Sequence, residues 1–127
     1  MPAYHKIAEC LLVEVNERYS LELYLGIIRE VAERCDRDGL QKVLIDFSHS
    51  NADPSITDRY VLGNEIARAW GFRIQGAGVA RSEIINFVME NVAVNRGANV
   101  KAFTTRQEAL QWLGITTTNE QLGNEAA

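Results

Sequence analysis

The feature that most constrains this fold is a short apolar run, Val43, Leu44 and Ile45, that ends at Asp46. Apolar residues that do not alternate with polar ones are typical of a strand covered on both faces, as in a parallel sheet between helices. A polar loop over residues 49–53 follows the strand. Because partners and ligands gather at the carboxyl ends of strands in open α/β sheets, we expect this loop to belong to the functional surface.

Strand and helix patterns alternate along the rest of the chain. We predict strands at residues 6–15, 43–48, 73–80 and 99–104, and helices at residues 20–38, 55–70, 82–96 and 105–113. Imperfect alternation in the first strand leaves open a bend or two short strands. The order predicts one α/β domain over residues 1–114, with a mostly parallel sheet of four or five strands, an antiparallel first strand at an edge, and about four helices. Beyond Ile115 the chain is polar and without periodicity, so we predict a flexible tail over residues 115–127.

The helix patterns indicate which faces are buried and where each helix begins. The first helix has one buried stripe, made of Tyr24, Ile27, Ile28, Val31 and Cys35. In the second helix, Tyr60, Gly63, Ala67 and Trp70 share a face, and a glycine in mid-helix indicates close packing. The start of that helix has two equally good interpretations. Either Ser55 and Asp58 form a capping box, or Asp53 is the cap and Pro54 the first helical residue.

Composition narrows the class of protein. The 127 residues are 46% apolar and 24% charged with a net charge of -4, which is typical of a single globular domain. No basic cluster follows one face, so nucleic acid is not an expected partner. The sequence has neither a signal-peptide pattern nor an apolar run of the ~20 residues that a membrane span needs, so we expect a cytoplasmic protein. Cys10 and Cys35 are expected to be buried free thiols.

Chemical motifs are weak throughout the sequence. The acidic loop residues Asp46, Asp53 and Asp58 could suit a cation, but such loops are usually solvated, and His49 has no second ligand at metal spacing. The glycines at residues 76–78 begin like a dinucleotide fingerprint but fall inside a strand instead of a turn. We therefore predict no catalytic residues, no metal and no cofactor, and a protein that is not an enzyme.

Four segments carry a resemblance to a known family. They are VLIDFS at residues 43–48, DPSITD at 53–58, NRGANVKAF at 95–103 and EALQWL at 108–113. Together they resemble the STAS domain, the fold of anti-sigma-factor antagonists and of the cytoplasmic part of sulfate transporters. The chain is more closely similar to the uncharacterised bacterial SpoIIAA-like proteins, which are grouped also with CRAL-TRIO lipid-exchange domains. The resemblance covers about residues 5–114.

This resemblance implies a site and a partner. In anti-sigma-factor antagonists an Asp-x-Ser strand end precedes an Asp-Ser-Ser-Gly motif, whose second serine is phosphorylated by a partner kinase. Residues 46–48 match the first piece, and residues 53–56 stand near the second, with Ser55 nearest to the acceptor. The implied partner is a protein, namely a regulatory kinase or an anti-sigma-like factor.

Two functional hypotheses follow. The first is a non-enzymatic regulatory or protein-interaction module that works through the loop and helix start of residues 46–58. Its candidate partner-binding or phosphoacceptor residues are Asp46, Ser48, Asp53, Ser55, Thr57 and Asp58. The alternative is a carrier of small apolar ligands or lipids, with a pocket lined by Tyr60, Phe87 and Met89. The apolar helix at residues 82–96 also predicts a homodimer, formed through it or through the helix that starts at Ser55.

Overall fold

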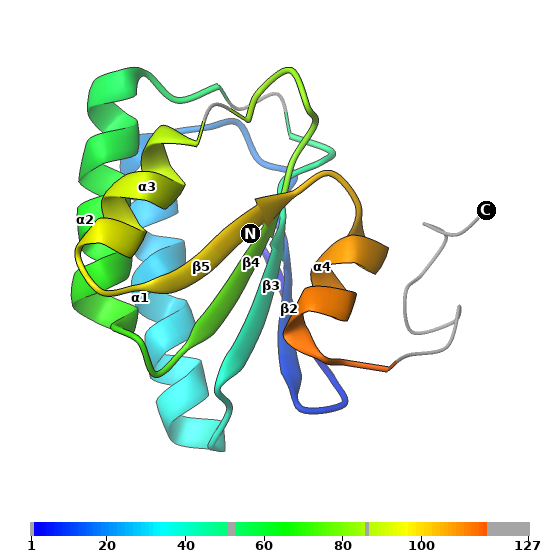
Figure 1. The fold of residues 1–127 in the computed structure, drawn as a ribbon. Helices are drawn as coiled ribbons and strands as arrows, with labels where there is room; N and C mark the ends of the chain where they lie inside the picture. The colour runs from blue at the N-terminus through cyan, green and yellow to red at the C-terminus, as the bar shows by residue number, and fades with distance from the viewer. Residues whose placement is uncertain (1, 51–52, 86, 117–127) are drawn as a thin grey trace.

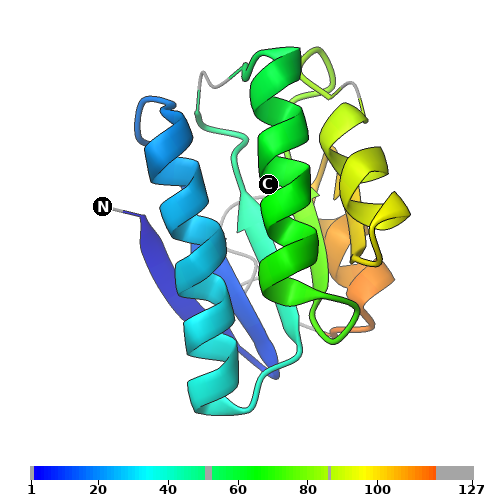
Figure 2. The same cartoon turned by 90° about the vertical axis from the view of Figure 1, so that its left-hand side faces the viewer.

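The described part of the chain folds as a five-stranded mixed sheet with three helices on one face and one on the other (Figures 1 and 2). We describe it from a computed structural model, which describes residues 2–50, 53–85 and 87–116. The elements follow in the order β1 (Ala3–Ile7), β2 (Cys10–Glu14), α1 (Leu21–Asp38), β3 (Lys42–Asp46), α2 (Ile56–Trp70), β4 (Gln75–Val79), α3 (Val88–Asn95), β5 (Asn99–Phe103) and α4 (Arg106–Leu113). The predicted α/β architecture is confirmed.

The sheet has the strand order β1-β2-β3-β4-β5. The β2, β3, β4 and β5 strands are parallel, and β1 pairs antiparallel with β2 at the edge. The predicted first strand is in fact two strands, joined by a turn at Ala8, whose backbone is left-handed with φ of 52°. The bend or second strand that the sequence left open is therefore a hairpin.

Two apolar cores lie on opposite faces of the sheet. The residues of β3 alternate between them, since Val43 and Ile45 join the larger core under α1, α2 and α3, while Leu44 joins the smaller core under α4. This double cover is the reason that β3 is apolar without alternation. Ile115 is also buried in the smaller core, and the predicted tail beyond it lies, from residue 117 on, outside the described residues.

The helix starts and stops follow local rules. Ser20 and Thr105 cap α1 and α4 through side-chain oxygens, and the predicted stripe of α1 is buried in full. At α2 the open question of the cap is settled, because the Ser55 side chain accepts the Asp58 N–H at 3.1 Å. The alternative with Asp53 as cap is wrong.

The helix α3 is shorter than predicted. It begins at Val88, whereas the sequence predicted a start after Ser82, and the segment just before it, at residues 82–84, forms a turn. Phe87, at the N-cap, has a left-handed backbone with φ of 65° and makes no side-chain capping bond. The apolar residues Ile84 and Ile85 therefore belong to a loop that packs over the sheet, which explains why this stretch is too apolar for one helix face.

Candidate functional site

The predicted site residues lie around the carboxyl end of β3, but they separate into a buried group and an exposed group. Asp46 is 4% exposed and ends β3. Its Oδ1 accepts the Ser48 N–H at 2.8 Å, and its Oδ2 accepts from Arg106 Nε at 2.7 Å. Burial raises the pKa of Asp46, but the hydrogen bonds from Ser48 and Arg106 outweigh it and the pKa is lowered. Asp46 is thus an ionised, buried group that faces α4.

Arg106 extends this buried group across the sheet. It is 8% exposed, and its Nη2 also donates to Glu14 of β2, whose Oε1 lies 3.1 Å from His5 Nε2 on β1. Asp46 and Glu14 raise the pKa of Arg106 although burial opposes the shift. The sequence analysis missed Arg106, yet its spacing to Ala109, Leu110 and Leu113 places it on the buried stripe of α4.

The exposed group surrounds the start of α2. Ser55, Ile56 and Thr57 are exposed, and so is the Asp53 side chain, at 75%. The Asp58 carboxylate, which a capping box would direct back to Ser55, instead accepts from the Tyr19 hydroxyl at 2.7 Å. Ser55 and Thr57 are therefore open to solvent at a helix N-terminus, whereas Ser48 is half-buried.

Exposed apolar side chains adjoin Ser55 on α2. Ile56 is 61% exposed and Tyr60 is 50% exposed, and the two lie one helical turn apart on the same face. Tyr60 also borders a shallow hollow formed with Val88 and Val92 of α3. We call Ser55, Ile56 and Tyr60 the α2 surface.

A second arginine that the sequence analysis missed is buried beside this surface. Arg59 is 5% exposed and connects three segments of the chain. Its Nε donates to the Pro54 carbonyl at 2.9 Å, and its Nη2 donates to Asp53 Oδ1 at 2.8 Å and to the Ile84 carbonyl at 3.1 Å. Arg59 therefore connects the loop before α2 to the loop before α3.

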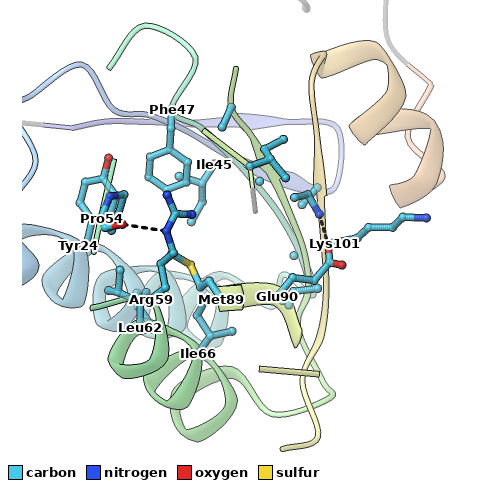
Figure 3. Close-up of a pocket in the computed structure, with 18 of the residues that line it drawn as sticks. Tyr24, Ile45, Phe47, Pro54, Arg59, Leu62, Ile66, Met89, Glu90 and Lys101 are labelled. Carbon is cyan, nitrogen blue, oxygen red and sulfur yellow. Dashed lines mark hydrogen bonds between the residues drawn. The ribbon is translucent and has the colours of Figure 1, made fainter. Parts of the chain in front are cut away.

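Arg59 also lines an apolar cavity of about 150 Å³ between the sheet and the helices α1, α2 and α3 (Figure 3). Phe87 and Met89 line it as well, but Tyr60 lies outside it. The other labelled lining residues in Figure 3 are Tyr24, Ile45, Phe47, Pro54, Leu62, Ile66, Glu90 and Lys101. The three predicted pocket residues are thus divided between the cavity and the α2 surface.

The two glycines of β4 shape this cavity in different ways. A Cβ at Gly76 would lie 2.5 Å from Cζ3 of the buried Trp70, so Gly76 makes room for that ring. A Cβ at Gly78 would have no atom within 4 Å. Gly78 therefore leaves a space that the side chain of any other amino acid at this position would occupy.

The remaining polar groups offer little chemistry. Among the described residues, no group of three or more His, Cys, Asp or Glu side chains could hold a metal ion. Cys10 and Cys35 are free and buried, and burial raises the pKa of Cys10 to about 12 and that of Cys35 to about 11. No helix in the described part of the chain is long and apolar enough to cross a membrane.

The fold just described is that of anti-sigma factor antagonists. An anti-sigma factor antagonist from Mycobacterium paratuberculosis matches with a TM-score of 0.62 and 14% identity, covering 90% of this chain and 93% of its own. The protein TM1081 matches with a TM-score of 0.59 and 17% identity, over 91% of this chain and 90% of its own. SpoIIAA in its unphosphorylated form matches with a TM-score of 0.54 and 7% identity, over 92% of this chain and 100% of its own.

The resemblance to anti-sigma-factor antagonists is thus confirmed as a likeness of fold over about nine-tenths of the chain. No protein-family model matches the sequence, and neither does any curated protein.

Proposed function

We propose that this protein is a cytoplasmic, non-enzymatic regulatory module that binds a protein partner through the α2 surface. The observation that carries the proposal is the exposure of Ile56 and Tyr60, at 61% and 50%, beside the exposed hydroxyl-bearing Ser55. Large apolar side chains that share an exposed helix face are a common feature of protein-binding sites. Their place at the carboxyl end of the strands fits the usual location of such sites in α/β sheets.

The likeness of fold supports a partner of the anti-sigma type. Two of the similar structures are those of anti-sigma factor antagonists, and one of these is the unphosphorylated form of SpoIIAA. We therefore propose an anti-sigma-like factor or a regulatory kinase as the partner. No residue of the buried group around Asp46 takes part directly in this proposal.

Ser55 is the residue that we propose as the switch. A phosphate on Ser55 would stand at the N-terminus of α2, where free N–H groups and the helix dipole stabilise an anion. It would also add charge beside Ile56 and close to the carboxylates of Asp53 and Asp58. Phosphorylation would therefore leave the fold intact while it changes the surface that the partner contacts.

Photo-crosslinking combined with surface variants tests the α2 surface. In one variant of the protein a benzoylphenylalanine replaces Tyr60. In a second variant it replaces Phe72, which is 72% exposed at the other end of α2. We expect a partner cross-linked from position 60 and not from position 72. Ile56→Ser should abolish this cross-link and Phe72→Ser should leave it unchanged. Equal cross-linking from both positions would refute the α2 surface as the binding site.

The switch is tested with the same partner. Ser55→Asp should change its affinity at least tenfold, since the added charge lies at the contact, and Thr57→Asp serves as the neighbouring control. Peptide mass spectrometry of protein from its native cells should show a phosphate on Ser55. Partner binding that is unaffected by Ser55→Asp would rule out the switch and leave the α2 surface standing.

The homodimer expected from the sequence stays a proposal. Ile84, Ile85 and Phe87 line the cavity and do not form a helix face, and the exposed apolar side chains of the two helices include Val61 on α2 and Val94 on α3, which are 37% and 46% exposed. Light scattering over a range of concentrations tests it, and a constant monomer mass would exclude a dimer.

A further inference from the structure

The protein-binding function proposed for the α2 surface makes no use of the apolar cavity beside Arg59. It lies between β4, β5 and the three helices of one face, with a volume of about 150 Å³ (Figure 3). Phe87 lines the cavity and is 52% exposed, so the cavity reaches the surface beside this residue. A cavity with such a connection to solvent is accessible to a small molecule.

Its size and lining define the apolar part of such a molecule. Interiors are close-packed, and a space of 150 Å³ lined by side chains such as Leu62, Ile66 and Val100 is a substantial void. In another protein, an apolar cavity of about 150 Å³ contains no water and binds a molecule of the size of benzene. The apolar part of the ligand is thus a single ring or a chain of about six carbons.

The cavity is kept open by a residue that weakens its strand. Glycine in a strand interior costs conformational entropy and contributes no side chain to the packing. Gly76 has a structural reason, because it accommodates the Trp70 ring, but a Cβ at Gly78 would meet no atom within 4 Å. No neighbouring side chain therefore requires a glycine at position 78.

Arg59 defines the polar part of the ligand. Three charged residues line the cavity, and of these Glu90 is engaged by the Ala102 N–H at 2.6 Å, while Lys101 is exposed. Arg59 is buried, and its only carboxylate partner among the described residues is Asp53, whose side chain is 75% exposed. A ligand carboxylate could replace Asp53 with little loss, because Asp53 would return to water.

The geometry of the guanidinium favours this exchange. Its Nε and Nη2 already donate to two carbonyls and Asp53, and no described residue accepts from its Nη1. A guanidinium binds a carboxylate through two parallel N–H donors, and such charged pairs are strong when they are shielded from water. In Figure 3 the Arg59 side chain points from α2 towards Phe47 at the cavity wall.

We propose that the cavity binds a small apolar carboxylic acid, with its ring or short chain beside Gly78 and its carboxylate on Arg59. This site goes beyond the protein-binding function and does not depend on it. The residues that would bind the ligand differ from those of the α2 surface, so an experiment can disprove either site without disproving the other.

Methyl NMR with a pair of probes tests the proposal. Benzoate is titrated into the protein and compared with benzyl alcohol, which has nearly the same size and no charge. Ile45 and Ile66 line the cavity, whereas Ile7 and Ile115 pack on the other face of the sheet. We expect saturable shifts of the first pair of methyl groups and none of the second, with benzoate bound at least tenfold more tightly than benzyl alcohol.

Two variants separate the cavity from the charge. Gly78→Val fills the open space and should abolish benzoate binding, while Gly26→Val, at an exposed position of α1 with no neighbour within 4 Å, should not. Arg59→Lys should remove the preference for benzoate over benzyl alcohol. The absence of saturable shifts in the wild type, or binding retained in Gly78→Val, would overturn the site. Equal affinities for the two probes in the wild type would overturn the role of Arg59.

Discussion

Asp46 and Arg106 form a buried ion pair between two residues that are 60 positions apart in the chain. Asp46 ends β3 and Arg106 begins α4, and the exposed fractions of their side chains are only 3% and 9%. The pair fixes the first turn of α4 against the sheet, where the cationic side chain would otherwise be disfavoured by the helix dipole. The aspartate that ends the central strand therefore stabilises the fold from the face opposite to the α2 surface.

Asp46→Asn should destabilise the protein. The substitution leaves Arg106 buried with Glu14 as its remaining acidic partner, and loss of one member of a buried pair costs about 3 kcal/mol. Urea unfolding measures the loss of unfolding free energy. Asp36→Asn is the control, because its pair with Arg73 is exposed, and it should change the free energy by less than about 0.5 kcal/mol. Equal effects of the two substitutions would contradict the stabilising role of Asp46.

Ser55→Ala should lower the unfolding free energy by about 1 kcal/mol, because the alanine cannot accept the Asp58 N–H. Ser55→Asp should stay close to the wild type, since an aspartate also caps helices and its charge suits a helix N-terminus. Thr57→Ala is the control within the same turn and should have little effect. Thermal unfolding at one pH compares all three variants, and a stable Ser55→Ala would show that the cap contributes nothing.

The elements that the sequence predicted well are those fixed by local interactions. The stripe of α1, its Ser20 cap and the glycine at residue 39 act within a few residues of one another, so the sequence alone carries them. The apolar run of β3 was also predicted correctly, because a strand covered by helices on both faces has no alternation of apolar and polar residues. The predicted start of α3 was wrong, because the left-handed backbone of Phe87 and the loop before it are determined by tertiary packing around the cavity.

The two buried arginines show a further limit of sequence patterns. Arg59 and Arg106 each occupy a position on the apolar stripe of a helix, but a charged residue is normally assigned to the wet face. On α2 this assignment placed Tyr60 on the buried face in place of Arg59, an error of one residue and about 100° around the helix. Asp46 and Glu14, the acidic partners of Arg106, lie 60 and 92 residues away, so no local pattern could identify these pairs, whereas Asp53 lies only six residues before Arg59.

Glu65 should make the stability depend on pH in the acid range. Its side chain is 11% exposed, accepts from Arg68 of α2 and from Arg29 of α1 at 3.0 Å, and has a pKa lowered to about 2, chiefly by Arg68. A lowered pKa contributes stability above the ordinary value near 4.5, and this contribution is lost as the pH falls towards 2.

Glu65→Gln tests this prediction. It should cost about 1–2 kcal/mol at pH 7, a range discounted because the two arginines are exposed, and the difference from the wild type should shrink towards pH 2. Unfolding free energies measured between pH 7 and pH 2 give the comparison. Glu33→Gln, at an exposed position of α1, should run parallel to the wild type. A Glu65→Gln curve that is also parallel to the wild type would disprove the coupling.

Gly63 is a position where α2 and α3 lie close together, and substitution there should separate the two helices. A Cβ at Gly63 would lie 2.7 Å from the Met89 carbonyl oxygen and 2.8 Å from the Val92 Cβ, and the backbone atom cannot move without displacing α3. Gly63→Ala should therefore lower the unfolding free energy by about 1–3 kcal/mol, although alanine favours a helix by about 1 kcal/mol. Gly26→Ala is the matched control, since an added Cβ there has no neighbour within 4 Å and should stabilise the protein. Chemical unfolding of both variants decides the matter, and a Gly63→Ala protein as stable as Gly26→Ala would mean that the two helices are not in close contact.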